Sequence, residues 1–235
     1  MKMQPGRRAP LLFATILLFG AVCAQAGDDF PGGKPDRRVL RTQQKVDSLF
    51  EKGDYERAYF IYREELVPLG DKYAQYMVGY MTLVGKGVAS DVIAGSAWYR
   101  LAAERGDSSF KQASDEVWGL LNEEQRRAST QQYLALRREF SDAMIVAGLI
   151  EKDLDLLQDR IEVVGISRDL VGAQYFNNDE VAKREAEAIS RIEDRLKFIA
   201  AAFDKPGLLS DDEVRRIEQI EARANGILEA YEPPR

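Results

Sequence analysis

The residue types that most often carry out enzyme chemistry are nearly missing from this chain. Its 235 residues include no histidine and one cysteine, Cys23. Because the chain has no histidine, no imidazole is present to activate a serine or cysteine nucleophile. A zinc site built from histidine and cysteine is excluded for the same reason. Carboxylates remain as the main candidates for chemistry.

Adjacent acidic residues, such as Glu64–Glu65, Glu123–Glu124 and Asp211–Asp212, are the places to look for such carboxylates. A glycosidase needs two carboxylates facing each other across a cleft, about 5 to 10 Å apart. Neighbouring residues of a helix point in different directions, so we expect solvated faces and helix starts here. No Asp-x-Asp-x-Asp-Gly calcium loop occurs either. The sequence therefore predicts no catalytic, cofactor-binding or metal-binding residue, and a carboxylate-based hydrolase is the enzymatic alternative.

The first 26 residues have the three parts of a secretory signal. Arg7 and Arg8 form a basic start, residues 11–24 form an apolar run, and Ala24-Gln25-Ala26 is a small-x-small cleavage site. The apolar run is shorter than the roughly 20 residues that span a bilayer, which favours cleavage after Ala26 over an uncleaved anchor. We expect a periplasmic or secreted protein with no stable membrane insertion after cleavage.

Lipidation at Cys23 is the alternative fate of this leader. It would require a small residue just before the cysteine and usually a leucine three before it, where the chain has Val22 and Gly20. We therefore do not expect a lipoprotein.

Cleavage after Ala26 removes the only cysteine, so the mature chain can form no disulfide. Cleavage also removes three basic residues and no acid, which makes the mature chain more acidic than its formal charge of −6. We expect no binding to nucleic acid through charge.

The elements that must position any functional residue are predicted to be helices throughout. Residues 27–38 are rich in glycine, proline and charge and predict a disordered linker. From residue 39 onward apolar residues recur at helical spacing, without sustained alternation. The expected helix pairs are 40–52 with 55–67, 71–84 with 91–105, and 107–121 with 123–140, with breaks at Gly53, Pro68 and Gly70 and with Asn122 as an N-cap.

Helix pairs that recur at this spacing are typical of a stacked α-solenoid. The clearest unit covers residues 71–107. It contains Tyr73-Ala74-Gln75-Tyr76-Met77-Val78-Gly79, then Gly85-Lys86-Gly87-Val88, then Asp91, Ala94, Trp98-Tyr99, Ala102-Ala103 and Gly106. In these residues it resembles the Sel1-like repeat, a relative of the tetratricopeptide repeat. Residues 43–70 and 108–138 are looser matches, so the resemblance implies a repeat domain over residues 39–140.

Each residue of the repeat motif has a structural interpretation. Small residues would let helices approach closely: Ala74, Gly79, Ala102 and Ala103. Gly85 and Gly87 would allow loop dihedrals that a Cβ forbids. Asp91 is expected to cap the second helix of the unit. Trp98 and Tyr99 are expected to fill the space between units.

Three tyrosines of the same unit are the candidate partner-binding residues. Tyr73, Tyr76 and Tyr80 recur at positions i, i+3 and i+7 of the first helix. In Sel1-like proteins the first helices line the concave surface that faces the partner, so the resemblance implies that these tyrosines could contact one. Packing between repeats is the alternative.

Residues 141–235 change character and predict a separate helical region. Apolar residues there alternate at spacings of three and four: Ala143, Ala147, Ile150, Leu154, Leu157 and Ile161; Ile189, Ile192, Leu196, Ile199 and Phe203; Ile217, Ile220, Ala224, Ile227 and Tyr231. Gly165 and Asn177-Asn178 are expected to interrupt the helices, and Ser210 with Glu213 predicts a capping box. Such seams bury against another helix. They would form either a helical hairpin or bundle packed on the solenoid, or a coiled-coil surface for dimerisation or for a partner helix.

Three functions are consistent with these features. The resemblance implies an adaptor or scaffold of the bacterial cell envelope that binds a protein or peptide through its helical-repeat surface. A second hypothesis is an envelope-glycan (peptidoglycan fragment) binding protein or a cell-wall-related enzyme, although similar exported Sel1 proteins have repeats stapled by cysteine pairs, which the mature chain lacks. The third is a structural homodimer formed through the C-terminal helices.

Overall fold

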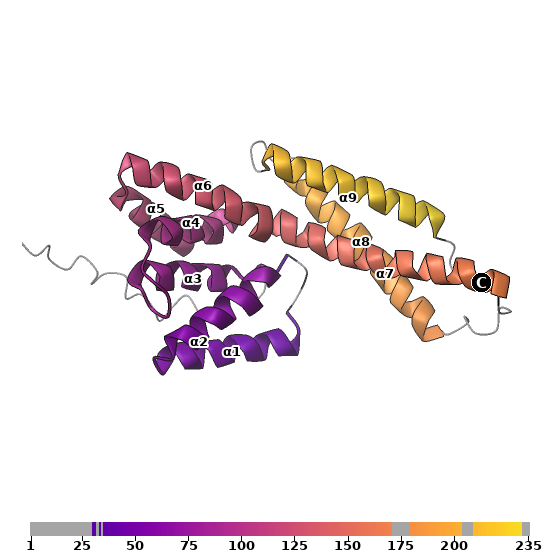
Figure 1. Ribbon diagram of the computed structural model, residues 1–235, viewed down its shortest axis with the longest axis horizontal. Coiled ribbons are helices and arrows are strands. Elements are labelled where there is room, and N and C mark those ends of the chain that lie inside the picture. Colours follow the sequence, from indigo (N-terminus) through magenta and orange to yellow (C-terminus); the bar gives the residue numbers. More distant parts are fainter. Residues whose placement is uncertain (1–29, 32, 34, 171–178, 204–208, 232–235) are drawn as a thin grey trace, which may run out of the picture.

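A computed structural model describes residues 30–31, 33, 35–170, 179–203 and 209–231. Helices make up this part of the chain and no strand occurs in it, which confirms the all-α prediction. The helices fall into two groups, a stack formed by α1 to α6 and a bundle formed by α7 to α9 (Figure 1). None of the described helices is both long and apolar enough to cross a membrane.

The α-helices of the repeat stack are α1 (Arg37–Glu51), α2 (Tyr55–Phe60), α3 (Lys72–Val84), α4 (Val92–Ala102), α5 (Ser108–Leu120) and α6 (Glu123–Phe140). Among them α1 packs on α2 and α3 packs on α4, as predicted, whereas α5 and α6 pack mainly on α4 rather than on each other, so the predicted pairing of 107–121 with 123–140 is wrong. The ends of these helices are set by caps. The side chains of Asp71, Asp91, Asp107 and Asn122 accept hydrogen bonds from backbone N–H groups of the helices that follow them. Asn122 forms a complete capping box with Gln125, so the predicted N-cap is confirmed.

The chain enters the stack earlier than the sequence predicts. Asp36 accepts hydrogen bonds from the backbone N–H groups of Arg38 and Val39, at 2.7 and 2.9 Å, and so starts α1 at Arg37. The last two residues of the segment 27–38 are therefore helical, and the prediction of a linker is wrong for them.

The second helix also departs from the prediction, which placed one regular helix over residues 55–67. After α2 the backbone widens into a π-helix, η3 (Ile61–Leu66), and then tightens into a 3₁₀ turn, η4 (Val67–Leu69). Pro68 prevents a regular helix from continuing here, because a proline has no N–H to donate to the carbonyl four residues before it and its ring clashes with that carbonyl. Gly70, with φ of 82°, then ends the helix.

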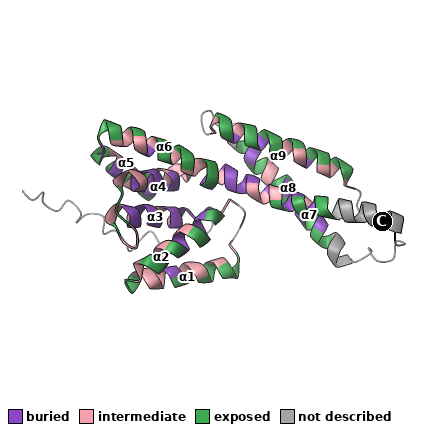
Figure 2. Ribbon diagram, viewed as in Figure 1, coloured by how far each residue is buried: buried purple, intermediate pink, exposed green. Residues whose placement is uncertain are grey.

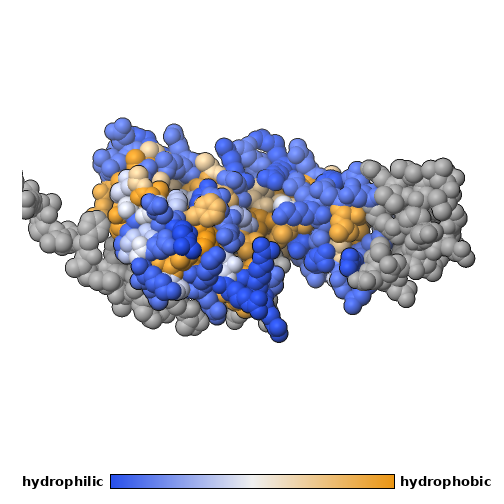
Figure 3. Space-filling view, turned by 60° about the horizontal axis from the view of Figure 1, so that its bottom comes forward, coloured by the Kyte–Doolittle hydropathy of each residue, from blue (hydrophilic) through white to orange (hydrophobic). Residues whose placement is uncertain are grey.

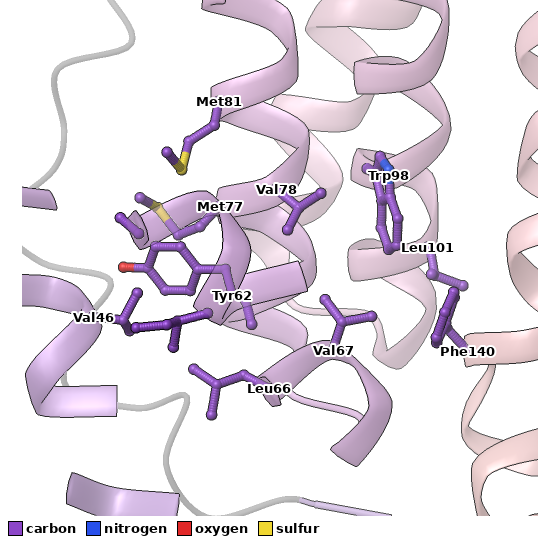
Figure 4. Close-up of a cluster of buried hydrophobic side chains, with 13 residues drawn as sticks. Val46, Tyr62, Leu66, Val67, Met77, Val78, Met81, Trp98, Leu101 and Phe140 are labelled. Atoms are coloured by element: carbon purple, nitrogen blue, oxygen red, sulfur yellow. The ribbon is translucent and has the colours of Figure 1, made fainter. Parts of the chain in front are cut away.

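A hydrophobic core runs through the repeat stack (Figures 2 and 4). Tyr62 from η3 lies between α1 and α3, where its hydroxyl donates a hydrogen bond to Asp47 at 2.7 Å. Trp98 of α4 packs on Phe140 at the end of α6, with ring centroids 5.8 Å apart. Phe140 thus ties the last helix of the stack to its core.

The bundle consists of α7 (Asp142–Leu170), α8 (Asp179–Phe203) and α9 (Asp211–Ala230), which pack on one another around their own core. Buried residues of the predicted seams form that core, among them Ile150, Leu154, Leu157, Ile192, Ile199, Ile217 and Ile220. Ser210 and Glu213 form the predicted capping box of α9. The seams therefore pack against each other within one chain, as the bundle interpretation predicts.

Helix α7 is longer than expected. It continues through Gly165, so the prediction of an interruption at that residue is wrong. A single glycine costs a helix only about 1 kcal/mol relative to alanine, which a long helix packed in a bundle tolerates. The predicted interruption at Asn177-Asn178 lies outside the described residues.

Candidate functional site

A cleft with a volume of about 580 Å³ lies where the repeat stack meets the bundle. On the stack side it is lined by the segment that precedes α1 and by η3 and η4, and on the bundle side by α7 with side chains from α8 and α9. Most of its lining is apolar, including Phe30, Pro35, Val39, Leu69, Phe140, Met144, Ile145 and Leu149. Figure 3 shows one face of the molecule, on which patches of hydrophobic surface are surrounded by hydrophilic surface.

The π-helical segment supplies the stack wall of this cleft. Arg63, in the middle of η3, lies with its guanidinium carbon 4.8 Å from the ring centroid of Phe140 and 5.1 Å from that of Trp98. A guanidinium over aromatic faces at these distances is a cation–π arrangement. Arg63 is thereby held against the core, while Glu64 beside it is exposed at the cleft.

The charges around the cleft are unequally distributed between its two walls. The stack wall carries the acidic residues Asp36, Glu64 and Glu139, and the bundle wall carries the basic residues Lys152, Arg195 and Arg216. Arg63 is the exception on the stack side, and its guanidinium lies over rings rather than beside the bundle. The cleft therefore combines an apolar floor with an acidic rim on one side and a basic rim on the other.

A network of buried charges next to the cleft holds the two halves in place. Lys72, at the start of α3, is 5% exposed, and its Nζ lies 3.3 Å from Asp142 Oδ1 and 3.6 Å from Glu104 Oε2. Arg105 binds Asp142 in a bidentate manner, at 2.7 and 3.0 Å, and also donates to the carbonyl of Gly70 at 2.8 Å. Because Asp142 is the first residue of α7, these contacts fix the start of the bundle to the stack.

The network continues to the last helix of the bundle. Arg137 of α6 lies 3.1 Å from Glu104 and 3.2 Å from Glu213. Glu213 is only 1% exposed, and it also accepts a hydrogen bond from the Ser141 hydroxyl at 2.9 Å. Three cations, Lys72, Arg105 and Arg137, thus face three carboxylates. Such a balance is needed because an unpaired buried charge is strongly destabilising.

The carboxylates of the network respond differently to this environment. Burial raises the pKa of Glu104, and the charges of Lys72 and Arg137 offset only part of that effect. Burial also acts to raise the pKa of Asp142, but the hydrogen bonds and charges of Arg105 and Lys72 outweigh it, so the pKa is lowered. Asp142 is therefore an ionised anchor at neutral pH.

The three candidate tyrosines are half-buried between helices. Tyr76 stacks on Tyr99 and Phe110, with centroids 4.8 and 5.1 Å apart. Tyr73 meets the edge of Tyr62 at 6.3 Å, and Tyr80 meets that of Phe50 at 6.2 Å. The structure places none of the three among the described residues that line the cleft. Their partner-binding role stays a prediction, and their observed contacts are packing contacts.

The residues of the repeat motif occupy structural positions. Asp91 accepts hydrogen bonds from the backbone N–H groups of Ile93 and Ala94, at 2.8 and 3.0 Å. Three of the motif glycines have positive φ: Gly85 (72°), Gly87 (74°) and Gly106 (86°). A methyl group at Gly79 would lie 2.7 Å from Cδ1 of Tyr99. Buried members of the motif are Ala74, Trp98, Tyr99 and Ala102, and half-buried members are Ala94 and Ala103.

The adjacent acidic pairs lie on exposed faces and at helix starts. Glu123–Glu124 and Asp211–Asp212 are in the first turns of α6 and α9. Of the first pair, Glu64–Glu65, Glu64 alone lines the cleft. No group of three or more histidine, cysteine, aspartate or glutamate side chains in the described ranges could hold a metal ion.

Sequence reasoning missed the cleft and most of the charged network. Glu213 was identified only as a capping residue, although its second oxygen binds Ser141. A weak signal was present at two helix starts. Lys72 directly follows the N-cap residue Asp71, and Asp142 directly follows Ser141, whose hydroxyl accepts a hydrogen bond from the backbone N–H of Met144 at 3.4 Å. Which of these charges meet depends on how the two halves pack.

Comparisons with protein-family models, curated proteins and solved structures find no match to this chain.

Proposed function

We propose that this protein is an exported, non-catalytic adaptor of the bacterial cell envelope, which binds a segment of a partner protein in the cleft between the repeat stack and the bundle. The observation that carries the proposal is the construction of the cleft. It has an apolar floor and a charged rim, as protein-binding surfaces do.

The charged network supports this proposal because it makes the cleft rigid before a partner arrives. Both walls are attached to the network, the stack wall through Gly70 and the bundle wall through Asp142. A preorganised surface loses less conformational freedom on binding, which favours affinity.

The environment of the tryptophans favours a protein partner over a glycan. A sugar usually stacks on an exposed aromatic face, whereas each indole in this chain is covered by one of its own arginines. Arg63 lies over Trp98 at 5.1 Å and Arg100 lies over Trp118 at 4.8 Å. The leader described above supports export, and the lack of histidine and cysteine after residue 23 supports a role without catalysis.

The test is site-specific photo-crosslinking in the native envelope. A photoreactive residue is placed at Leu69 or Leu149, which line the cleft, and at Leu120 or Leu134, which are exposed outside its lining. We expect both cleft positions, and neither control position, to capture the same protein. The purified partner should then bind the wild type, and Leu69→Asp should weaken binding at least tenfold without a change in the circular dichroism spectrum. Equal capture at the control positions, or no effect of Leu69→Asp, would overturn the proposal.

A further inference from the structure

We infer that the cleft accepts an amphipathic partner segment, which places an apolar side chain over Gly148 and directs an acidic edge to the bundle wall and a basic edge to the stack wall. This inference rests on the proposed function, because it specifies the chemistry of the segment that the cleft would bind.

Gly148 leaves an unfilled position in the floor of the cleft. The floor follows one face of α7, where Met144, Ile145, Gly148, Leu149 and Lys152 all line the cleft at the spacing of neighbouring turns. A Cβ added at Gly148 would meet no atom within 4 Å. The fold therefore does not need a glycine there for close packing, although glycine costs a helix about 1 kcal/mol relative to alanine. The space is open to a side chain from another molecule.

The basic wall has charge available for a partner. Lys152 is exposed and forms no ion pair within the described part of the chain. Arg216 lies 3.2 Å from Glu151, and its side chain stays 45% exposed. Arg195 differs, since it is bound to Asp153 and donates to the carbonyl of Leu149 at 3.1 Å. Lys152 and Arg216 are thus the cations that can pair with carboxylates of an incoming segment.

The acidic wall has matching carboxylates. Glu139, at the end of α6, is exposed and has no ion pair among the residues described. Glu64 is also exposed, and the nearest arginine nitrogen lies 3.9 Å away, at the limit of an ion pair. Asp36 is occupied by the N–H groups that start α1. A segment with opposite charges on its two edges complements both walls, whereas a segment with one sign of charge is repelled by one of them.

Two designed peptides test this complementarity on the full mature protein. Both are fluorescein-labelled 16-residue helix formers of identical composition, with one leucine stripe flanked by glutamate and lysine. In the first peptide glutamate follows one edge and lysine the other, and in the second the two charges alternate on each edge. Fluorescence anisotropy should give at least fivefold tighter binding of the first peptide. Equal binding of the two, or no binding of either, would overturn the inference.

Variants of the protein locate the anchor. Gly148→Leu fills the open position and should weaken binding of the first peptide at least tenfold. Gly226→Leu is the matched control, since Gly226 is a helical glycine of α9 that also has no atom within 4 Å of an added Cβ but does not line the cleft. It should leave binding unchanged. Unchanged binding to Gly148→Leu, or equal losses in the two variants, would count against an anchor at Gly148.

The charge contacts are tested separately. Lys152→Glu combined with Arg216→Glu should reduce the preference for the first peptide to less than twofold, while Arg215→Glu, on the same helix but outside the cleft lining, should preserve it. Retention of the preference in the double variant would overturn the proposed orientation. Cleft-specific capture of a partner by photo-crosslinking, together with failure of both peptides, would contradict this inference and leave the proposed function standing. Failure of both experiments would contradict both.

Discussion

Gly87 combines two requirements that a residue with a Cβ cannot meet together. Its φ is 74°, and a Cβ there would overlap the backbone carbonyl of Tyr55. Gly106 shares the positive φ, at 86°, but a Cβ there would meet no atom within 4 Å. Alanine substitutions at Gly106 and Gly87 therefore distinguish two contributions to the free energy of unfolding. Gly106→Ala reports the cost of the left-handed backbone alone, and Gly87→Ala reports that cost together with the cost of the close contact.

We expect Gly106→Ala to lower the free energy of unfolding by about 1 kcal/mol, the cost of a left-handed conformation for an L-residue. Gly87→Ala should cost about 2 kcal/mol more, because the loop must also move away from α2. Urea unfolding followed by circular dichroism measures both. Equal losses would mean that the contact with Tyr55 contributes nothing.

Asp142 makes stability depend on pH in a defined direction. Its pKa is lowered in the folded state, so its ionisation stabilises the fold above the ordinary aspartate pKa of about 4. That stabilisation is lost as the pH falls through the lowered folded-state value. Asp142→Asn should cost about 3 kcal/mol at pH 7, and the difference from the wild type should shrink below pH 4. A difference that is constant from pH 7 to pH 3 would contradict this role.

Side-chain contacts between residues that are close in the sequence could be predicted, and contacts between residues that are far apart in the sequence could not. Asp91, Asn122 and Ser210 were identified as caps because their partners lie two or three positions away. Arg105 and Asp142 are 37 positions apart, and Ser141 and Glu213 are 72 apart. Only the packing of the helices decides that such residues meet.

At the scale of the elements, the seam of α7 shows why periodicity is a good predictor. Leu157 belongs to the seam and is fully buried, while its neighbour Leu156 is 45% exposed. Leu157→Ala should lower the free energy of unfolding by about 2 to 5 kcal/mol, the range for a large-to-small change in a core. Leu156→Ala should change it by no more than about 0.5 kcal/mol. Thermal unfolding of the two variants distinguishes them, and similar losses would contradict the assigned seam.

The π-helical turn is an element that periodicity could not predict. The apolar residues of 55–67 fit a regular helix, and Ile61, Tyr62 and Leu66 are buried as such a pattern requires. The π-helical backbone differs from the predicted helix, although these residues stay in the core. The change matters at the cleft, because Arg63 and Glu64 lie in the widened turn.

At the scale of the whole molecule, Glu213 connects two halves that have separate cores. Replacing it with glutamine leaves Arg137 with one carboxylate fewer in a buried site. We expect a loss of about 3 to 5 kcal/mol, expressed as separate unfolding of the stack and the bundle. Both tryptophans, Trp98 and Trp118, lie in the stack, so fluorescence reports on the stack and circular dichroism on both halves.

In urea the two signals should coincide for the wild type and separate for Glu213→Gln. Asp212→Asn is the control, since Asp212 pairs with Arg138 on the surface, at 2.7 Å. It should cost no more than about 1 kcal/mol and should leave the two curves coincident. Coincident curves for Glu213→Gln would show that the network does not couple the halves.

The all-helical class and the division near residue 140 were predictable, because each depends on apolar spacing within short segments. The cleft was not, because its walls come from residues 30–39, 63–69 and 139–152 together with Arg195 and Arg216. Two helical groups of known sequence can dock in many arrangements. The charged residues that favour one arrangement lie at helix ends that are far apart in the chain.

Ser141 is the single residue between α6 and α7: its N–H donates to the carbonyl of Arg137 at 3.1 Å, and its own carbonyl accepts from Ile145 at 2.9 Å. Figure 1 shows α7 continuing in the direction of α6. The backbone torsions of Ser141, which is extended, therefore set the direction of α7 relative to α6. With a rise of about 1.5 Å per residue, α7 is about 43 Å long. A difference of about 10° in that direction would place the far end of α7 about 7 to 8 Å away, so the ion pairs of Asp142 and Glu213 also fix where the opposite end of the bundle lies.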